Sequence, residues 1–187
     1  MAGTSSLDAY QFPKPLLGFC AYGSGAGKTT LLTSLIPVLI GRGIRLSIIK
    51  HAHHKFDIDQ PGKDSYRLRE AGAVQTLVAS NIRWALMTER HRIADKKNSE
   101  VGLAELLPEI DSDMVDLVLI EGFKQAKIDK IEIYRPSLEY PLLASDDKSI
   151  IAIATDAPLA HHLPTLNLNN PENIADFVMQ WMKVSTQ

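Results

Sequence analysis

The chain has 187 residues, of which 45% are hydrophobic and 22% are charged, as in an ordinary globular protein. Its formal net charge is −2 and no basic run exceeds two residues, which argues against a nucleic-acid-binding protein. No apolar stretch is long enough to span a bilayer. Cys20, the single cysteine, lies in an apolar run and is expected to be buried rather than reactive. We therefore expect a cytoplasmic protein with no membrane partner.

Short apolar segments alternate with amphipathic ones along the chain. The apolar segments predict strands at residues 15–21, 44–50, 76–80, 83–89, 115–120, 131–134 and 149–154. The amphipathic segments predict helices at residues 28–41, 65–71, 102–110 and from about 170 onward, with Asp64 or Ser65 capping the second of them. This alternation indicates an α/β fold, a mostly parallel sheet flanked by helices, with a β-hairpin excursion.

The segment YGSGAGKTT, residues 22–30, joins the first strand to the first helix. Gly27-Lys28-Thr29 matches the end of the phosphate-loop motif, although Tyr22 stands where the motif has its first glycine. A flexible turn is the alternative, but a strand before the loop and a helix after it are what the motif requires. We therefore expect a P-loop NTPase-like fold, with a loose tail at 1–14 and a single nucleotide-binding domain at 15–187.

The chemistry of this loop suits a nucleotide triphosphate and Mg²⁺. Backbone N–H groups in a tight turn and the amino end of a helix attract phosphate. Lys28 adds a full positive charge, and the Thr29 hydroxyl can bind Mg²⁺. The residues expected to contact the nucleotide are Gly23, Ser24, Gly25, Ala26, Gly27, Lys28, Thr29 and Thr30.

Polar residues follow the other buried strands, and in a parallel sheet such strand ends meet at one edge. Glu121 follows the strand 115–120 and is expected to hold the Mg²⁺ shell or to position a water molecule. Asp156 follows the strand 149–154, and we hypothesise that it accepts hydrogen bonds from guanine ring nitrogens. Asp116 lies at the opposite end of its strand and is expected to be structural.

The loop after the second strand, KHAHHKFDIDQPGKDS, leaves three readings open. His51, His53 and His54 could supply imidazoles to a transition metal, although the spacing matches no standard zinc site. Alternatively, Asp57 or Asp59 reaches Mg²⁺ or water, with Lys50 and Lys63 near the substrate. We assign Asp57 as a metal ligand and Asp59 as a catalytic residue on this second reading. A solvated polar loop is the third.

Taken together, these segments resemble the molybdopterin-guanine dinucleotide biosynthesis adaptor family, MobB. The matching stretches are residues 25–32, IKHAHH at 49–54, DIDQPGKDSYRLREAGA at 57–73, RWALMTE at 83–89, DLVLIEGFK at 116–124 and ATDAPL near residue 155. The tail and the lysine-rich residues 92–111 depart most from the family pattern.

The resemblance implies a GTP-binding protein with weak GTPase activity that assists the molybdopterin nucleotidyltransferase, and also proteins that load molybdopterin. It further implies a homodimer paired through extended β elements, for which residues 76–80 and 83–89 are the candidates. A small-molecule kinase is a competing hypothesis, but the chain has no clear arginine-rich lid. A GTP-dependent metal-delivery chaperone is the other, suggested by the three histidines.

Overall fold

A computed structural model describes residues 10–52, 56–94 and 100–185 of the chain. The chain divides into two compact units, which are treated separately here. The sheet unit comprises Met1–His51 and Gly102–Gln187, and the hairpin unit comprises Ala52–Val101. The loose tail at 1–14 and the single domain at 15–187 stay predictions.

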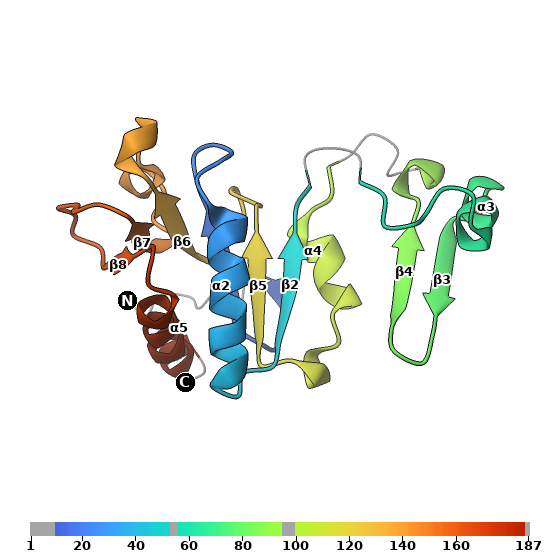
Figure 1. Ribbon diagram of the computed structural model, residues 1–187, viewed down its shortest axis with the longest axis horizontal. Helices are drawn as coiled ribbons and strands as arrows, with labels where there is room; N and C mark the ends of the chain where they lie inside the picture. The colour runs from blue at the N-terminus through green and yellow to red at the C-terminus, as the bar shows by residue number, and fades with distance from the viewer. Residues whose placement is uncertain (1–9, 53–55, 95–99, 186–187) are drawn as a thin grey trace. The chain divides into compact units, whose positions relative to one another are not determined.

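The sheet unit is built on a six-stranded sheet with the order β2-β5-β1-β6-β7-β8 (Figure 1). Its strands are β1 (Leu16–Cys20), β2 (Leu46–Lys50), β5 (Leu117–Glu121), β6 (Asp129–Tyr134), β7 (Ile150–Thr155) and β8 (Thr165–Asn167). Every neighbouring pair is parallel, which confirms the predicted sheet. All the strands therefore end at the same edge, where ligands bind in folds of this kind.

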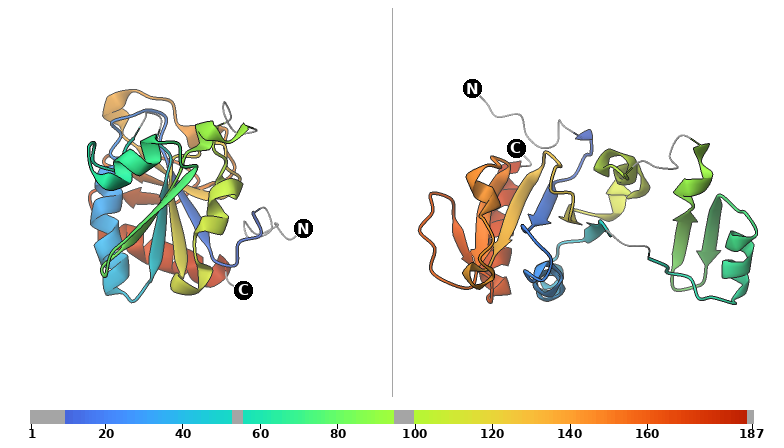
Figure 2. Two further views of the ribbon diagram at one scale, coloured as in Figure 1. Left: turned by 90° about the vertical axis from the view of Figure 1, so that its right-hand side faces the viewer. Right: turned by 90° about the horizontal axis from the view of Figure 1, so that it is seen from above.

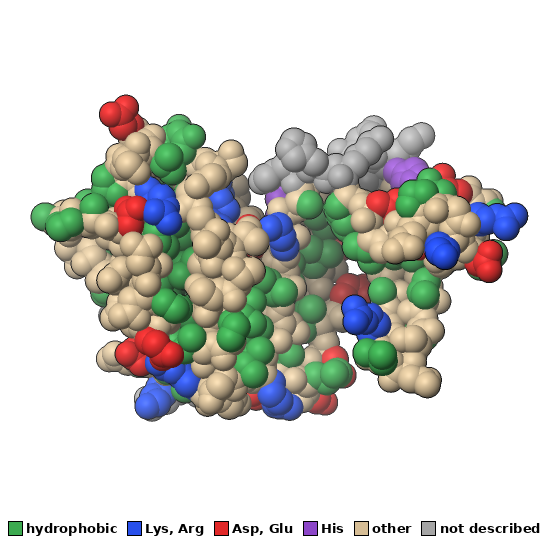
Figure 3. All heavy atoms as spheres, viewed as in Figure 1, with side chains coloured by type: hydrophobic (Ala, Val, Ile, Leu, Met, Phe, Trp, Pro, Cys, Tyr) green, Lys and Arg blue, Asp and Glu red, His purple; other side chains and the backbone are tan. Residues whose placement is uncertain are grey.

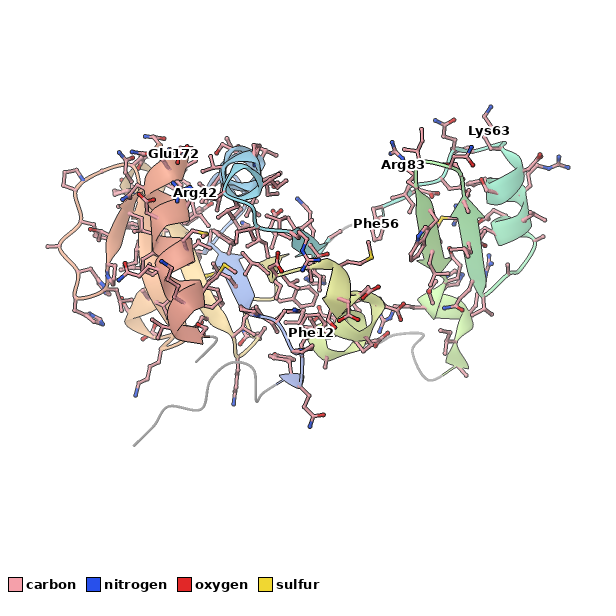
Figure 4. All side chains as sticks on the ribbon, turned by 90° about the horizontal axis from the view of Figure 1, so that it is seen from below. Phe12, Arg42, Phe56, Lys63, Arg83 and Glu172 are labelled. Atoms are coloured by element: carbon pink, nitrogen blue, oxygen red, sulfur yellow. The ribbon has the colours of Figure 1, made fainter. Side chains whose placement is uncertain are left out.

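Helices cover both faces of this sheet (Figure 2). On one face, α2 (Lys28–Gly41) and α5 (Pro171–Ser185) bury leucine, isoleucine and valine side chains against the strands. On the other face, α4 (Leu103–Leu106) and the 3-10 helix η3 (Leu107–Glu109) pack with Phe12. Arg42, just after α2, forms an ion pair with Glu172 on α5 and so ties the two helices together (Figure 4). The remaining 3-10 helices of this unit are η4 (Ser112–Met114), η5 (Pro136–Leu138) and η6 (Leu143–Ser145).

Strand β6 carries two charged side chains that are buried within the sheet itself. Lys130 on β6 is only 2% exposed, and it pairs in register with Gly18 on β1. A Cβ at Gly18 would lie 2.6 Å from Cγ of Lys130, so the glycine makes room for the lysine stem. Glu132, also on β6, accepts the backbone N–H groups of Leu143 and Ala144. Burial raises the pKa of this carboxyl above its ordinary value.

Cys20 confirms the expectation of a buried, unreactive thiol. It is a free cysteine at the end of β1 and is almost fully buried. Burial raises the pKa of the thiol to about 12, so the reactive thiolate does not form near neutral pH. Within the described ranges, no helix is both long and apolar enough to cross a membrane.

The hairpin unit contains the expected hairpin and a short helix. Its elements are α3 (Asp64–Glu70), β3 (Gln75–Ala79), β4 (Trp84–Thr88) and the 3-10 helix η1 (Arg90–Arg92). The two strands are antiparallel, and the turn is closed by a hydrogen bond from Ser80 N–H to the Arg83 carbonyl. The predicted cap of α3 is wrong: the N-cap is Lys63, with no side-chain cap. The Ser65 hydroxyl donates to Asp59 instead.

Hydrophobic side chains of the hairpin unit lie at its surface (Figure 3). Trp84 is 69% exposed and Leu77 is 63% exposed, although both lie within strands. Successive residues of a strand point to opposite faces, so a hairpin covered on one face would expose apolar residues at alternate positions only. In this unit the neighbouring residues Leu77 and Val78 are both exposed. Neither face of the hairpin is therefore fully covered within its own unit.

Candidate functional site

The loop between β1 and α2 has the conformation of an anion-binding turn. Gly25 and Gly27 have φ values of 78° and 98°, in the left-handed region that favours glycine. Gly27 is the N-cap of α2, and no side chain accepts from the first turn of the helix. Among the described residues, none accepts a hydrogen bond from the backbone N–H groups of residues 24–30. These donors, with the positive end of the helix dipole, suit a phosphate.

Lys28 is the first residue of α2 and its side chain turns back over the loop. Its Nζ donates a hydrogen bond of 3.2 Å to the Gly23 carbonyl. Partial burial lowers the pKa of this ammonium from its ordinary value, while the Glu121 carboxylate opposes that change. The ammonium is thus held against the loop by a carbonyl oxygen, and a phosphate oxygen would attract it more strongly.

The predicted cation ligands Thr29 and Glu121 lie together at the carboxyl edge of the sheet. The Thr29 hydroxyl donates to Glu121 Oε1 over 2.9 Å. The Lys50 ammonium, from the end of β2, lies 3.1 Å from the same hydroxyl oxygen and 3.0 Å from Glu121 Oε2. Glu121 is buried, so its negative charge needs a nearby partner. The oxygens that hold this ammonium are the hard donors that Mg²⁺ prefers, so the set fits that ion.

Arg135 joins the phosphate loop to Asp156. It comes directly after β6, between the neighbouring strands β1 and β7. Its Nε donates to the Ala26 carbonyl of the loop over 3.0 Å, and its Nη1 forms an ion pair with Asp156 Oδ2. The residue predicted to read guanine is therefore fixed to the loop predicted to bind phosphate.

Tyrosine rings flank the loop on the side of Tyr22, where the usual motif has a glycine. The ring of Tyr22 stacks on that of Tyr140, with their centroids 5.4 Å apart. The Lys124 ammonium donates to the Tyr22 carbonyl and lies 5.8 Å from the centre of its ring. Both tyrosines and Arg135 line a small pocket, together with Ala26 of the loop. The departure from the motif at Tyr22 is thus accommodated by packing.

Asp57 and Asp59 lie in the hairpin unit, where both face the buried side chain of Arg69 on α3. Arg69 Nη2 donates to Asp57 over 2.8 Å, and its Nη1 donates to Glu89 over 3.0 Å. Asp59 Oδ2 is buried, lies 3.7 Å from Arg69 Nε, and has no hydrogen bond. This cluster ties the loop at 57–60 to α3 and to the end of β4. The predicted metal and catalytic roles of the two aspartates stay predictions.

The histidine-based metal hypothesis falls partly outside the described residues, since His53 and His54 are not among them. The ring of His51 packs on that of Phe123, with the centroids 4.9 Å apart. In the ranges that the structure describes, no group of three or more histidine, cysteine, aspartate or glutamate side chains is placed to hold a metal. Asp116 is structural as expected: it pairs with Arg45, whose hydrogen bonds lower its pKa to about 2.

Sequence reasoning missed Arg135 and the cationic contact of Lys50 with Glu121. Polar residues that directly follow the strands of a parallel sheet meet at one edge. Arg135 directly follows the short strand at residues 131–134, so this rule could have found it. Its partners could not have been inferred, since Ala26 and Asp156 are distant from it in sequence and only the strand order brings them together.

A family model described as "MobB: Molybdopterin guanine dinucleotide synthesis protein B" matches residues 16–156. The chain is 49% identical over 170 residues to the molybdopterin-guanine dinucleotide biosynthesis adapter protein of Escherichia coli, covering 90% of this chain and 94% of that one. It is 45% identical over 168 residues to the protein of the same name from Haemophilus influenzae, covering 90% and 89%.

Solved structures show the same fold. The crystal structure of Bacillus subtilis MobB superposes with a TM-score of 0.68 at 26% identity, covering 90% of this chain and 98% of that one. A crystal structure of molybdopterin-guanine biosynthesis protein B gives a TM-score of 0.66 at 25% identity, covering 89% and 99%.

Proposed function

The chain belongs to the molybdopterin guanine dinucleotide synthesis protein B (MobB) family, and on that premise we propose that it is a GTP-binding adapter with weak GTPase activity in molybdopterin-guanine dinucleotide biosynthesis. The observation that carries the nucleotide-binding part is the loop at residues 23–30. Its backbone N–H groups are unpaired within the described chain, and Lys28 lies over it. Such a loop binds the phosphates of a nucleotide through groups that are already in position.

Thr29 and Glu121 would hold Mg²⁺ in this proposal, because their oxygens already hold the Lys50 ammonium. When bound, Mg²⁺ neutralises charge on the phosphates. Glu121 is also the candidate for positioning a water molecule. Asp57 as a metal ligand and Asp59 as a catalytic residue remain part of the proposal, but such roles require their contacts with Arg69 to open.

Replacing Lys28 with alanine tests the proposal. We expect GTP to bind about 10- to 100-fold more weakly, because a hydrogen bond to a charged group contributes about 1.5–3 kcal/mol. The measurement is a titration with a fluorescent guanine nucleotide in the presence of Mg²⁺. Thr33→Ala, on the exposed side of the same helix, is the matched control and should bind as the wild type does. Equal affinities for wild type and Lys28→Ala would remove Lys28 from the phosphate contacts.

We further propose that the adapter acts on the molybdopterin nucleotidyltransferase, and on proteins that load molybdopterin. Co-purification of the chain with the nucleotidyltransferase, with and without GTP, tests this part.

Transfer of phosphate to candidate acceptors, with water as the control, separates the adapter from a small-molecule kinase. The cytoplasmic location stays a prediction, as does the lack of a nucleic-acid partner.

The exposed hairpin supports the proposal of a homodimer. We expect Trp84→Asp to weaken dimerisation about 30-fold or more, because a buried aromatic anchor at an interface contributes about 2 kcal/mol or more. Size-exclusion chromatography with light scattering over a dilution series gives the dissociation constant. Val184→Asp, an exposed apolar position on α5, is the control and should leave the mass unchanged. A Trp84→Asp protein with the wild-type dissociation constant would show that the hairpin is not the interface.

A further inference from the structure

Arg135 occupies the point at which three strand ends meet. It follows β6, whose two neighbours are β1, leading into the phosphate loop, and β7, leading to Asp156. One planar guanidinium therefore reaches both a carbonyl of the loop and the carboxylate of Asp156. No motif in the sequence marks this residue.

We propose that Arg135 is the positioning residue for base selection, holding the Asp156 carboxylate in place for the edge of a guanine base. This inference rests on the proposed GTP binding. Asp156 gives one oxygen, Oδ2, to Arg135. An ionised carboxylate has about four acceptor sites on its two oxygens, so acceptors remain for the ring N–H and the amino group of guanine.

The Arg135 guanidinium donates to two different partners, so both are held at fixed positions around one rigid group. Nε donates to the Ala26 carbonyl and Nη1 to Asp156, so the plane of the guanidinium is fixed by two hydrogen bonds in different directions. The third nitrogen, Nη2, lies 3.4 Å from where a Cβ on Gly27 would be. The guanidinium therefore lies in van der Waals range of Gly27, in the loop itself. The orientation of Asp156 is thereby coupled to the conformation of the loop.

Charge gives a second reason for an arginine at this position. A bare carboxylate near a triphosphate repels it, whereas a paired carboxylate adds almost no net charge. The positive charge of the Arg135 guanidinium offsets the negative charge of Asp156, with which it forms an ion pair. It can do this while leaving the free acceptors of Asp156 available to the base.

A lysine would supply the charge but not the geometry. Its ammonium is a point charge on a flexible stem and lacks the rigid fork that bridges two acceptors. Arg135→Lys therefore keeps the positive charge and removes the geometry, which separates these two contributions. We expect it to retain most of the affinity for the triphosphate and to lose base selection.

The test compares GTP with inosine triphosphate, which differs from GTP only in lacking the amino group of the base. In GTP, the free oxygen of Asp156 would accept a hydrogen bond from that amino group. Affinities for both nucleotides are measured by isothermal titration calorimetry for the wild type, Arg135→Gln, Arg135→Lys, Asp156→Asn and the double variant Arg135→Gln/Asp156→Asn. Melting temperatures are recorded for every protein, so that loss of folding is separated from loss of selection.

We expect the wild type to prefer GTP, and each single variant to lose about tenfold of that preference, because the hydrogen bond from the guanine amino group to a charged carboxylate is weakened or lost. The double variant should lose no more than Asp156→Asn alone, because Arg135 acts through Asp156. Arg42→Ala removes an arginine with two ion pairs at the far end of α2, and it should keep the wild-type preference.

The outcomes distinguish this inference from the proposed function. A wild type that binds neither nucleotide contradicts the proposed GTP binding itself. A wild type that prefers GTP, with Arg135→Gln folded and equally selective, overturns the role of Arg135 and leaves GTP binding intact. Additive losses in the double variant would also overturn it, because Arg135 would then act independently of Asp156.

Discussion

Lys130→Ala is expected to lower the free energy of unfolding by about 3–5 kcal/mol, the range for breaking a buried charged contact by removing one partner. The Lys130 ammonium donates to the carbonyls of Lys124 and Ala126 over 2.8 and 2.9 Å, and it lies 2.8 Å from Asp147. Alanine leaves all three acceptors without this donor. It also removes the stem that fills the space beside Gly18.

Lys130→Met is the matched variant, because it keeps most of the stem and removes only the ammonium. We expect a loss of about 1–3 kcal/mol, the cost of leaving buried acceptors unpaired. Chemical denaturation monitored by circular dichroism measures both variants. If Lys130→Met were as stable as the wild type, the ammonium would contribute nothing and the stem alone would matter.

The stabilities of the wild type and of Lys130→Met should depend differently on pH. Burial raises the pKa of Asp147, but hydrogen bonds from Lys130 and Ser149 outweigh it and leave the pKa lowered in the folded state. The ionised carboxylate therefore stabilises the fold fully above its ordinary pKa of about 3.9, and this contribution is lost as the pH falls through the lowered folded value. In acid, the wild type should consequently lose the part of its advantage over Lys130→Met that comes from Asp147, and keep the part that comes from the carbonyls of Lys124 and Ala126.

Gly122→Ala is expected to cost about 2–5 kcal/mol of folding free energy and to weaken nucleotide binding with Mg²⁺. Gly122 has a φ of 99°, a region that costs a residue with a Cβ about 1–2 kcal/mol. The new Cβ would lie 2.8 Å from Cβ of His51, and such overpacking costs about 1–3 kcal/mol more. Gly122 follows Glu121 and His51 follows Lys50, so relief of the contact shifts both charged groups of the cation site.

Gly43→Ala isolates the backbone part of this cost. Gly43 has a φ of 85°, but a Cβ there would meet no atom within 4 Å. It should therefore lose only about 1–2 kcal/mol and bind nucleotide normally. Denaturation curves and the fluorescent nucleotide titration compare the two variants. Equal losses in both assays would show that the approach of His51 to Gly122 relaxes without disturbing Glu121.

The helices and strands predicted from the sequence agree best with the structure where glycines or a clear apolar pattern mark their ends. The helix predicted at 28–41 is bounded by the glycine loop and by Gly41-Arg42-Gly43, and α2 spans the same residues. The strand β8 was missed, because its three residues contain a single apolar side chain and its pairing comes from β7. Periodicity carries no information about so short a strand.

The site was predictable to the extent that it depends on strand ends. The phosphate loop was predicted from the Gly27-Lys28-Thr29 motif, whereas Glu121 and Asp156 were predicted because a parallel sheet collects its carboxyl ends at one edge. The pairing of Asp57 and Asp59 with Arg69 was not predictable, since it depends on how the loop at 57–60 folds against α3. Ion pairs between residues separated by a loop leave no periodic signal in the sequence.

The Lys50 ammonium gives Thr29 and Glu121 a counter-ion that belongs to the chain itself. An incoming Mg²⁺ would therefore have to displace the Lys50 ammonium. Its net gain in binding energy would be its attraction to Thr29 and Glu121 minus the attraction that the ammonium loses. That difference grows when the phosphates of a nucleotide arrive, because they add negative charge that one ammonium cannot balance. On the proposed function, the loop would thus keep its shape between ligands and would accept the metal and the nucleotide as a pair.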